Sequence, residues 1–413
     1  MTHHAFPVII THILKRLSLR SRNLIRAVGV LLFAGLLLPQ AHAESFEAWL
    51  SGVRTEAVGK GLSASTLQAL DGLTLDQEVL QLAARQPEYV KPPWAYLETM
   101  VSDTRKRRGR ELLAENKALF DRLEAAFGVD RELLAAIWGI ETNFGSYQGK
   151  KHILRALATL GHQGGRRTAF GRQQLLAALK IVEAGDIAGP RMLGSWAGAM
   201  GQTQFIPTTY LAYAVDFTGD GKRDVWDSKE DALGSAANYL SISGWRDTQR
   251  WGYEVSLPGA FDYTLADLKI RKSLSEWTQL GVTGIALPVP LTDEPAALFL
   301  PAGYRGPAFL VTGNFRAILR YNTAPAYALA AGILSDHYKG LEGVITPWPL
   351  NERPLHPKEL RDLQTRLSAN GYDTGGVDGM LGSRTKQAIR AFQTDKGLVP
   401  DGHATPGLLA LLP

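Results

Sequence analysis

Apolar residues recur at helical spacing along most of the first half of the chain, from Ser45 to about Ala237. Two stretches show the pattern most clearly: Leu112, Leu113, Leu119, Phe120, Leu123 and Phe127, and then Leu133, Leu134, Ile137 and Ile140. A recurrence every three or four residues predicts amphipathic helices whose apolar faces pack on a common core. The same pattern returns over residues 316–334. The chain is therefore predicted to be mainly α-helical.

The pattern changes between about residues 253 and 315. Six prolines in this region separate short apolar runs, such as residues 297–300 and 308–311. Short apolar runs bounded by turn-forming residues are typical of β-strands. We therefore expect a small β-containing insertion within the otherwise helical region.

The C-terminal segment is set apart by a proline-rich stretch, residues 346–357, which is typical of a semi-rigid linker. Residues 358–413 then carry two short apolar helix faces: Leu360, Leu363 and Leu367, followed by Ala388, Ile389 and Phe392. An Asp-Gly turn follows each face, at residues 378–379 and 401–402. A segment of this length has barely enough apolar surface for a core of its own. We interpret it as a separate small module that binds rather than catalyses.

The N-terminal segment, residues 1–43, has the features of a secretory signal peptide. Five basic residues and no acid accompany an apolar run over residues 27–38, and Ala41-His42-Ala43 follows. An uncleaved anchor is the alternative, but the run is shorter than the roughly 20 apolar residues that a membrane-spanning helix needs. No cysteine follows the run, so a lipoprotein is not expected. We expect an exported, soluble, periplasmic protein that begins near Glu44.

The net positive charge of the chain lies in the same residues, 1–43. The whole sequence has 45 basic and 40 acidic residues, and removing the five basic residues of 1–43 leaves 45 − 5 = 40 of each. A balanced charge gives no basic footprint for nucleic acid, and the basic run at 105–110 is interpreted as a solvated helix face. The absence of cysteine excludes disulfides, cysteine-ligated metals and cysteine nucleophiles.

One carboxylate, that of Glu141, lies at a position where its pKa should be raised. Glu141 follows Leu134, Ile137 and Trp138 by seven, four and three residues, so it points from the apolar face of a helix predicted to end near Gly145. Burial disfavours the charged form, and so does the negative end of the helix dipole. A raised pKa would suit a general acid. The alternative is a glutamate that reaches solvent or pairs with a basic residue.

A second carboxylate, which a hydrolytic glycosidase requires, is not evident from the local sequence. Between Glu141 and Glu183 there is no Asp or Glu. A partner could still come from farther along the chain, for example Asp216 or Asp224. Spacing alone leaves both possibilities open.

Several motifs together resemble the lytic murein transglycosylase B family. They are residues 137–145 around Glu141, residues 197–210, residues 216–221 with 225–227, and residues 320–322 with Tyr327. The tail resembles the peptidoglycan-binding domain that is often fused to such enzymes, on residues 363–364, 371–372, 377–379, 382, 385, 388–389, 392–393, 397–398 and 401–402. The resemblance implies a lysozyme-like catalytic domain over residues 44–345 and a three-helix peptidoglycan-binding module over 358–413.

The resemblance also implies a reaction. Such enzymes cleave the β-1,4 bond between N-acetylmuramic acid and N-acetylglucosamine without water and leave a 1,6-anhydro ring. A single glutamate, here Glu141, protonates the glycosidic oxygen and then takes the proton of the attacking 6-hydroxyl. The substrate's acetamido group takes the place of a second carboxylate, and the site excludes bulk water. We therefore expect a monomeric lyase that acts on peptidoglycan and needs no cofactor.

Further site residues follow from the same resemblance, because they match positions where the family lines its substrate cleft. They are Ser195, Gln204, Tyr96, Tyr239, Tyr321, Asn322 and Tyr327. Aromatic faces suit sugar rings, and phenol hydroxyls can orient hydrogen-bond donors. Each of these residue types also has an ordinary structural role. Ser195 follows a glycine and could close a turn, and tyrosines are common in cores.

The loop that begins at Asp216 nearly matches a calcium-binding loop. Asp216, Thr218, Asp220 and Asp227 take the ligand positions, and Gly221 is the glycine of the sharp turn. Thr218 and Asp227 depart from the usual ligands, and two basic residues of the loop oppose a cation. The alternative is an Asp-Gly turn ordered by its own hydrogen bonds. A calcium ion here would be structural.

Two alternatives to the transglycosylase remain at this stage. A hydrolytic muramidase would use Glu141 with a second acid, and a non-catalytic scaffold would bind the wall without cleaving it. Glu141 argues against the scaffold, because a protein without catalysis has no reason to keep an acid on an apolar face. The choice between lyase and hydrolase depends on the resemblance.

Overall fold

The computed structural model describes residues 44–84 and 91–413, so the predicted signal peptide lies outside the described residues. Helices dominate residues 46–242 and return at residues 313–338. They are α1 (Phe46–Gly59), α2 (Ala64–Leu67), α3 (Gln77–Ala84), α4 (Pro93–Met100), α5 (Asp103–Glu115), α6 (Lys117–Phe127), α7 (Arg131–Thr142), α8 (Ile153–His162), α9 (Thr168–Glu183), α10 (Pro207–Tyr213), α11 (Lys229–Ile242), α13 (Gly313–Tyr321) and α14 (Pro325–Tyr338). Two short strands, β1 (Lys151–His152) and β2 (Leu193–Gly194), pair in antiparallel fashion. The predicted mainly helical fold is confirmed.

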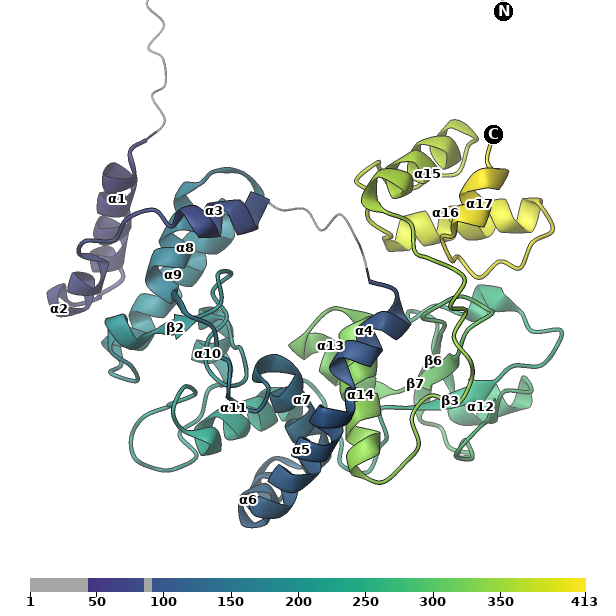
Figure 1. The fold of residues 1–413 in the computed structure, drawn as a ribbon, viewed down its shortest axis with the longest axis horizontal. Coiled ribbons are helices and arrows are strands. Elements are labelled where there is room, and N and C mark those ends of the chain that lie inside the picture. The colour runs from purple at the N-terminus through teal and green to yellow at the C-terminus, as the bar shows by residue number, and fades with distance from the viewer. Residues whose placement is uncertain (1–43, 85–90) are drawn as a thin grey trace, which may run out of the picture. The chain divides into compact units, whose positions relative to one another are not determined.

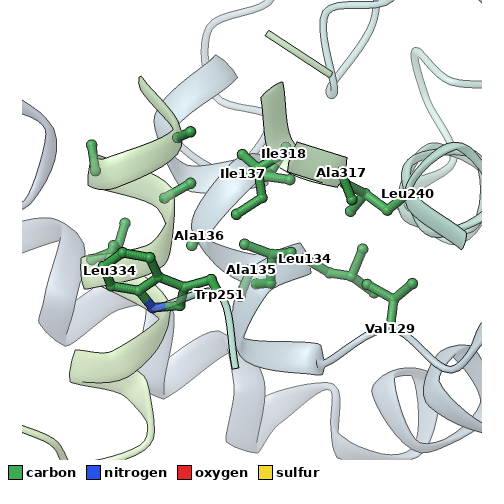
Figure 2. Close-up of a cluster of buried hydrophobic side chains, with 14 of the residues drawn as sticks. Val129, Leu134, Ala135, Ala136, Ile137, Leu240, Trp251, Ala317, Ile318 and Leu334 are labelled. Carbon is green, nitrogen blue, oxygen red and sulfur yellow. The ribbon is translucent and has the colours of Figure 1, made fainter. Parts of the chain in front are cut away.

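Helix α7 lies at the centre of the largest core. It packs against α14, α5, α11 and α6 (Figure 1). Seven consecutive residues, 133–139, are buried, because the helix is covered on nearly every side. Figure 2 shows part of this core: Ile137 of α7 lies next to Ile318 of α13, and Leu334 of α14 lies next to Trp251. A helix so enclosed is a rigid support for the residues at its end.

A five-stranded antiparallel sheet fills the region where the insertion is predicted. Its strands are β3 (Gly252–Ser256), β4 (Lys272–Ser273), β5 (Thr283–Gly284), β6 (Pro295–Phe299) and β7 (Ala308–Val311), in the order β4-β6-β7-β3-β5, with α12 (Leu274–Gln279) alongside. Phe299 and Phe309 face the core around α7, whereas Leu298 and Leu310 face a second core with Trp277. Both faces are buried, which explains why these strands are continuous apolar runs rather than alternating ones.

The C-terminal segment forms three helices: α15 (Pro357–Ala369), α16 (Ser383–Asp395) and α17 (Pro406–Leu411). Leu363, Leu367, Ile389, Phe392 and Leu408 form their common core. None of the helices in the described part of the chain is long and apolar enough to cross a membrane.

Candidate active site

Glu141 lies in the last turn of α7, and the chain turns sharply after it. Asn143, Phe144 and Gly145 follow with φ of 49°, 60° and 78°. Positive φ is unfavourable for residues with a side chain, and two of them in succession mark a backbone held in place by its surroundings. At the other end of α7, the Asp130 side chain pairs with Lys339, the residue that follows α14, rather than capping the helix.

The carboxylate of Glu141 is buried among tyrosines. The Tyr327 hydroxyl, on α14, donates a hydrogen bond of 2.7 Å to Glu141 Oε1. Burial raises the pKa of Glu141 to about 7, although the bond from Tyr327 acts to lower it. Burial and the nearby Glu141 charge also raise the pKa values of Tyr96 and Tyr321, so both phenols lie close to this carboxylate. The group can therefore hold or release a proton near neutral pH.

Gln202 fixes the turn that follows Glu141. Its Oε1 accepts the indole N–H of Trp138 at 3.0 Å, and its Nε2 donates to the Trp226 carbonyl at 3.2 Å. Its backbone carbonyl accepts the Thr142 hydroxyl, whose oxygen in turn accepts the Gly145 N–H. Gln202 was within the matched motif but was not predicted as a site residue. A buried amide with every partner supplied by the fold carries no signal in the sequence beyond its polarity.

Two of the predicted site residues, Ser195 and Gln204, lie against residues 142–149, the loop after Glu141. The backbone of Gly149 sits so close to Gly194 and Ser195 that a Cβ at Gly149 would lie 2.8 Å from the Ser195 nitrogen. Gln204 has a φ of 53°, and its Nε2 donates to the Gln148 carbonyl at 3.1 Å. The structure therefore places both residues in contact with the loop that follows Glu141.

The Ser195 hydroxyl also has the structural role that the sequence left open. Its oxygen accepts the Ala199 N–H at 2.9 Å, and the Ser195 N–H donates to the Ala199 carbonyl at 2.7 Å. These reciprocal bonds close the turn after β2. The hydroxyl proton can still be donated to a ligand, because these bonds use the oxygen only as an acceptor.

The remaining predicted tyrosines form an aromatic group next to the site. Tyr239 lies 5.3 Å from Tyr321, 4.2 Å from Tyr213 and 5.9 Å from Phe205, measured between ring centroids. The Tyr321 hydroxyl donates to the Thr203 carbonyl at 2.7 Å, next to Gln204. Tyr327 is buried, so it contacts Glu141 from within the core rather than presenting a face to solvent.

Asn322 follows α13, and its position is explained by the start of the next helix. Its Oδ1 accepts the Ala324 N–H at 3.1 Å, just before α14 begins. The side chain therefore connects α13, which carries Tyr321, to α14, which carries Tyr327. Asn322 follows Tyr321 directly in the sequence, and its amide nitrogen can act as a donor.

One residue of the basic run departs from the expected solvated face. Arg107, Arg108 and Arg110 are exposed, but the half-buried Arg105 turns inward and donates to the carbonyls of Gly139 at 2.9 Å and Thr99 at 2.9 Å. The interpretation is therefore wrong for Arg105. Its guanidinium satisfies one carbonyl in the last turn of α7 and one in the last turn of α4, where helices favour a positive charge.

The Asp216 loop brings three carboxylates together, but they are not the predicted set. Oxygens of Asp216, Asp220 and Asp231 lie within 4.8 Å of one another. Asp227 lies outside this group and pairs with Arg191, while Thr218 donates from its hydroxyl to Asp216 at 3.1 Å. The expected ligand Asp227 is thus replaced by Asp231, which comes from α11 and was not predicted.

The chemistry of this donor set fits a hard cation only in part. Carboxylate oxygens are suitable ligands for calcium. The Asp216 carboxylate, however, already accepts the N–H groups of Gly219 and Gly221 at 2.7 Å each, and Asp231 accepts the N–H groups of Phe217 and Asp224. These bonds order the loop from within, as the Asp-Gly alternative anticipates.

Comparison with known proteins agrees with this arrangement. A transglycosylase SLT domain family matches residues 45–336, and a peptidoglycan binding domain family matches residues 356–412. Membrane-bound lytic murein transglycosylase B of Escherichia coli is 33% identical over 255 residues, which is 58% of this chain and 68% of that protein.

Solved structures extend the similarity to nearly the whole chain. SltB3 of Pseudomonas aeruginosa, in complex with NAG-anhNAM-pentapeptide, has 50% identity and a TM-score of 0.87, over 89% of this chain and 99% of that one. Escherichia coli Slt35 in complex with calcium has 29% identity and a TM-score of 0.61, over 70% and 92%. The chain therefore belongs to the SLT-domain family of lytic transglycosylases, with a peptidoglycan-binding domain at its C-terminal end.

Proposed function

We propose that Glu141 is the general acid and then the general base of peptidoglycan cleavage. As an acid, Glu141 transfers its proton to the glycosidic oxygen between N-acetylmuramic acid and N-acetylglucosamine, and the bond to the anomeric carbon breaks. As a base, it takes the proton of the muramic acid 6-hydroxyl, whose oxygen bonds to the anomeric carbon. No water is consumed, and the product ends in a 1,6-anhydro ring. The observation that carries this proposal is the pKa of about 7 at a buried carboxylate.

Tyr327 positions this carboxylate and supports its change of role. Its hydroxyl bonds to Glu141 Oε1 and stabilises the ionised form that exists between the two proton transfers. The phenols of Tyr96 and Tyr321 lie near the same charge. We assign Ser195, Gln204, Tyr96, Tyr239, Tyr321 and Asn322 to substrate binding, as donors and aromatic surfaces for the sugars.

The hydrolytic alternative is less well supported. It requires a second carboxylate that activates water. Among the described residues, no acid contributes to the pKa of Glu141, which is set by burial and by Tyr327. The two acids considered from the sequence, Asp216 and Asp224, accept backbone N–H groups of their own loop. The complex of SltB3 with NAG-anhNAM-pentapeptide, a ligand that contains an anhydro sugar, also favours the lyase.

The remaining features complete the proposal. We place the catalytic domain at residues 44–345, the linker at 346–357 and the wall-binding module at 358–413. The signal-like residues 1–43 and the peptidoglycan substrate support a periplasmic location. The calcium complex of Slt35 supports a structural cation at the Asp216 loop, with no part in the proton transfers. We infer a monomer that contacts glycan strands.

Substitution of Glu141 tests this proposal. Glu141→Gln should fold and bind purified sacculi but fail to release soluble fragments, because an amide cannot donate the proton. Glu132→Gln, on the same helix, is the matched control and should cleave normally. Pelleting with sacculi measures binding, and chromatography of the supernatant measures release. Substantial release by Glu141→Gln would contradict the single-residue mechanism.

A further inference from the structure

The C-terminal module contains the same hydrogen-bonded turn twice. In the first copy, Gln364 Nε2 donates to Asp378 Oδ1 at 2.9 Å and Gln364 Oε1 accepts the Gly379 N–H at 2.8 Å. In the second copy, Gln393 Nε2 donates to Asp401 Oδ1 at 2.8 Å and Gln393 Oε1 accepts the Gly402 N–H at 2.9 Å. A buried glutamine on α15 and one on α16 thus hold two equivalent Asp-Gly turns.

The equivalence extends to the backbone around each turn. Gly379 and Gly402 have φ of 76° and 72°. In each copy the residue after the glycine donates its N–H to the aspartate Oδ1, from Met380 at 2.8 Å and from His403 at 2.9 Å. The two turns therefore have the same internal hydrogen bonds, which use one aspartate oxygen, Oδ1, in each copy.

The second copy shows what this turn binds. Asp401 Oδ2 accepts the N–H of Tyr304, in the loop between β6 and β7, at 3.0 Å. The preceding residue, Gly303, lies directly against the turn, since a Cβ added there would be 2.7 Å from Asp401 Oδ2 and 2.9 Å from His403 Cβ. The bound element is a short peptide segment with one N–H and a residue that has no L side chain.

The backbone of Gly303 has the handedness of a D-residue. Its φ is 70°, a positive value that is strained for L-residues but that a D-residue adopts readily. The Cβ of a D-alanine replaces the other Cα hydrogen, so it avoids the position that contacts Asp401 and His403. At Gly303 the segment seated on the second turn thus has a φ that a D-alanyl residue adopts without strain.

The first copy of the turn has an exposed aspartate, although Arg361 of α15 lies against its glycine, with Nε 3.2 Å from a Cβ added at Gly379. Asp378 is exposed, and its neighbours Val377 and Met380 are 49% and 56% exposed. In the second copy the equivalent of Met380 is His403, which packs on Gly303. The exposed Val377 and Met380 side chains lie beside a carboxylate held by the turn, an arrangement that suits a ligand with a methyl group and an N–H.

We propose that the Asp378 turn binds the D-alanyl end of peptidoglycan stem peptides, in the way that the Asp401 turn binds Gly303–Tyr304. Asp378 accepts an amide N–H of the peptide, and Val377 and Met380 contact the D-alanyl methyl group. The inference rests on the proposed action on peptidoglycan, but it concerns the peptides rather than the glycan bond. The module then selects wall segments by their peptides, apart from the site at Glu141.

Binding of a labelled stem peptide to the full chain tests this proposal. The probe is L-Ala-γ-D-Glu-diaminopimelyl-D-Ala-D-Ala, compared with the same peptide ending in L-Ala-L-Ala, by fluorescence anisotropy. Asp378→Asn keeps an oxygen for the two internal bonds but places an amide where the ligand's N–H is accepted. We expect at least about a tenfold loss of affinity from this substitution and from the L-Ala ending. Met380→Ala gives a second, milder change if Asp378→Asn is poorly folded.

The control is Asp373→Asn, which removes the same charge from an exposed position of the same module. It should leave the affinity within about twofold of the parent, as for surface substitutions away from a contact. Equal affinity for the two peptides, or full affinity in both Asp378→Asn and Met380→Ala, would overturn the proposal. Analysis of the products in parallel distinguishes this inference from the proposed function. Anhydro products, together with peptide affinity that neither Asp378→Asn nor Met380→Ala lowers, would contradict this inference and leave the proposed transglycosylase activity unaffected.

Discussion

At the scale of single residues, the environment of Glu141 determines what its carboxyl group can do. Burial raises its pKa to about 7, while Tyr327 donates a hydrogen bond that favours the ionised form. An acid that must first give a proton and then take one benefits from a pKa near the working pH. The buried position therefore allows one carboxyl group to act first as the acid and then as the base, whereas a hydrolase divides these roles between two carboxylates.

The pH dependence of cleavage follows from this pKa. The rate should fall as the pH rises above about 7, because the first step needs the protonated acid. Tyr327→Phe removes a bond that lowers the pKa of Glu141, so the decline should move to higher pH while kcat falls by about tenfold or more. Tyr338, on the same helix, donates its hydroxyl to the Arg105 carbonyl instead, so Tyr338→Phe serves as the control. An unshifted decline in Tyr327→Phe would contradict this role.

Stability should also report the raised pKa. The folded-state pKa of about 7 lies above the ordinary value of 4.5, so the folded protein binds more protons between these values and loses stability as the pH rises through them. Glu141→Gln removes this loss. Above pH 7 the variant should be more stable than the parent by up to about 3 kcal/mol, with the advantage shrinking towards pH 4. Urea unfolding at several pH values measures it, and an advantage independent of pH would argue against a buried, protonated Glu141.

At the scale of elements, the active site depends on how α7 ends. Three successive residues with positive φ turn the chain away from Glu141, and Gln202 holds that turn through Trp138, Thr142 and Trp226. Arg105 supports the same helix end from the other side through the Gly139 carbonyl. Neither residue touches the carboxylate. Both fix the direction in which it points.

Removing the Gln202 amide should loosen this arrangement. Gln202→Met leaves the Trp138 indole N–H and the Trp226 carbonyl without this partner, at a cost of about 1–3 kcal/mol for a buried group. We expect a lower Tm together with a drop in kcat that exceeds any rise in KM, because the glutamate is displaced. Gln173→Met, an exposed change on α9, should alter neither quantity. Full activity in Gln202→Met would show that the turn after α7 keeps its conformation without the Gln202 side chain.

Divalent cations should contribute little to the Asp216 loop. Its carboxylates are held by backbone N–H groups, so removal of metal with EDTA should leave the cleavage rate within about twofold. Added calcium should raise Tm slightly by relieving the repulsion among Asp216, Asp220 and Asp231. Asp231→Asn should remove that increase. A rate that collapses in EDTA and returns with calcium would contradict a purely structural ion.

The sequence predicted the elements better than it predicted their connections. Apolar spacing was sufficient for α7 and for the strands around Phe299 and Phe309, because it reflects local periodicity. The motifs predicted Ser195 and Gln204 as residues near the glutamate, and both contact the loop that follows Glu141. Sequence reasoning missed the roles of Gln202, Arg105 and Asp231, since these depend on partners far away in the chain. A polar residue has no periodicity that would reveal such a partner.

At the scale of the whole molecule, the wall-binding module is joined to the β-containing insertion by defined contacts. Arg390 of α16 pairs with Asp267 at 3.2 Å, and Asp401 accepts the Tyr304 N–H. The start of the linker is held as well, because Glu254 of β3 accepts the N–H groups of Ile345 and Thr346. The module is therefore positioned by the catalytic domain rather than carried on a free tether.

Deletion of residues 346–413 should separate wall association from chemistry. We expect weaker pelleting with sacculi and nearly unchanged turnover of short soluble glycans, because Glu141 and its tyrosines belong to the preceding residues. A second variant, Arg390→Met, keeps the module but removes its ion pair with Asp267. Complete loss of turnover on soluble glycans, in a truncated protein that is still folded, would contradict this division of roles.

The most direct measurement is mass spectrometry of the products released from purified sacculi. The account predicts muropeptides lighter by one water molecule than hydrolysed ones, with no reducing muramic acid end, and no incorporation of oxygen from isotopically labelled water. Products of full mass that carry the labelled oxygen would contradict it, because they would mean that water, activated by a second group, attacks at Glu141.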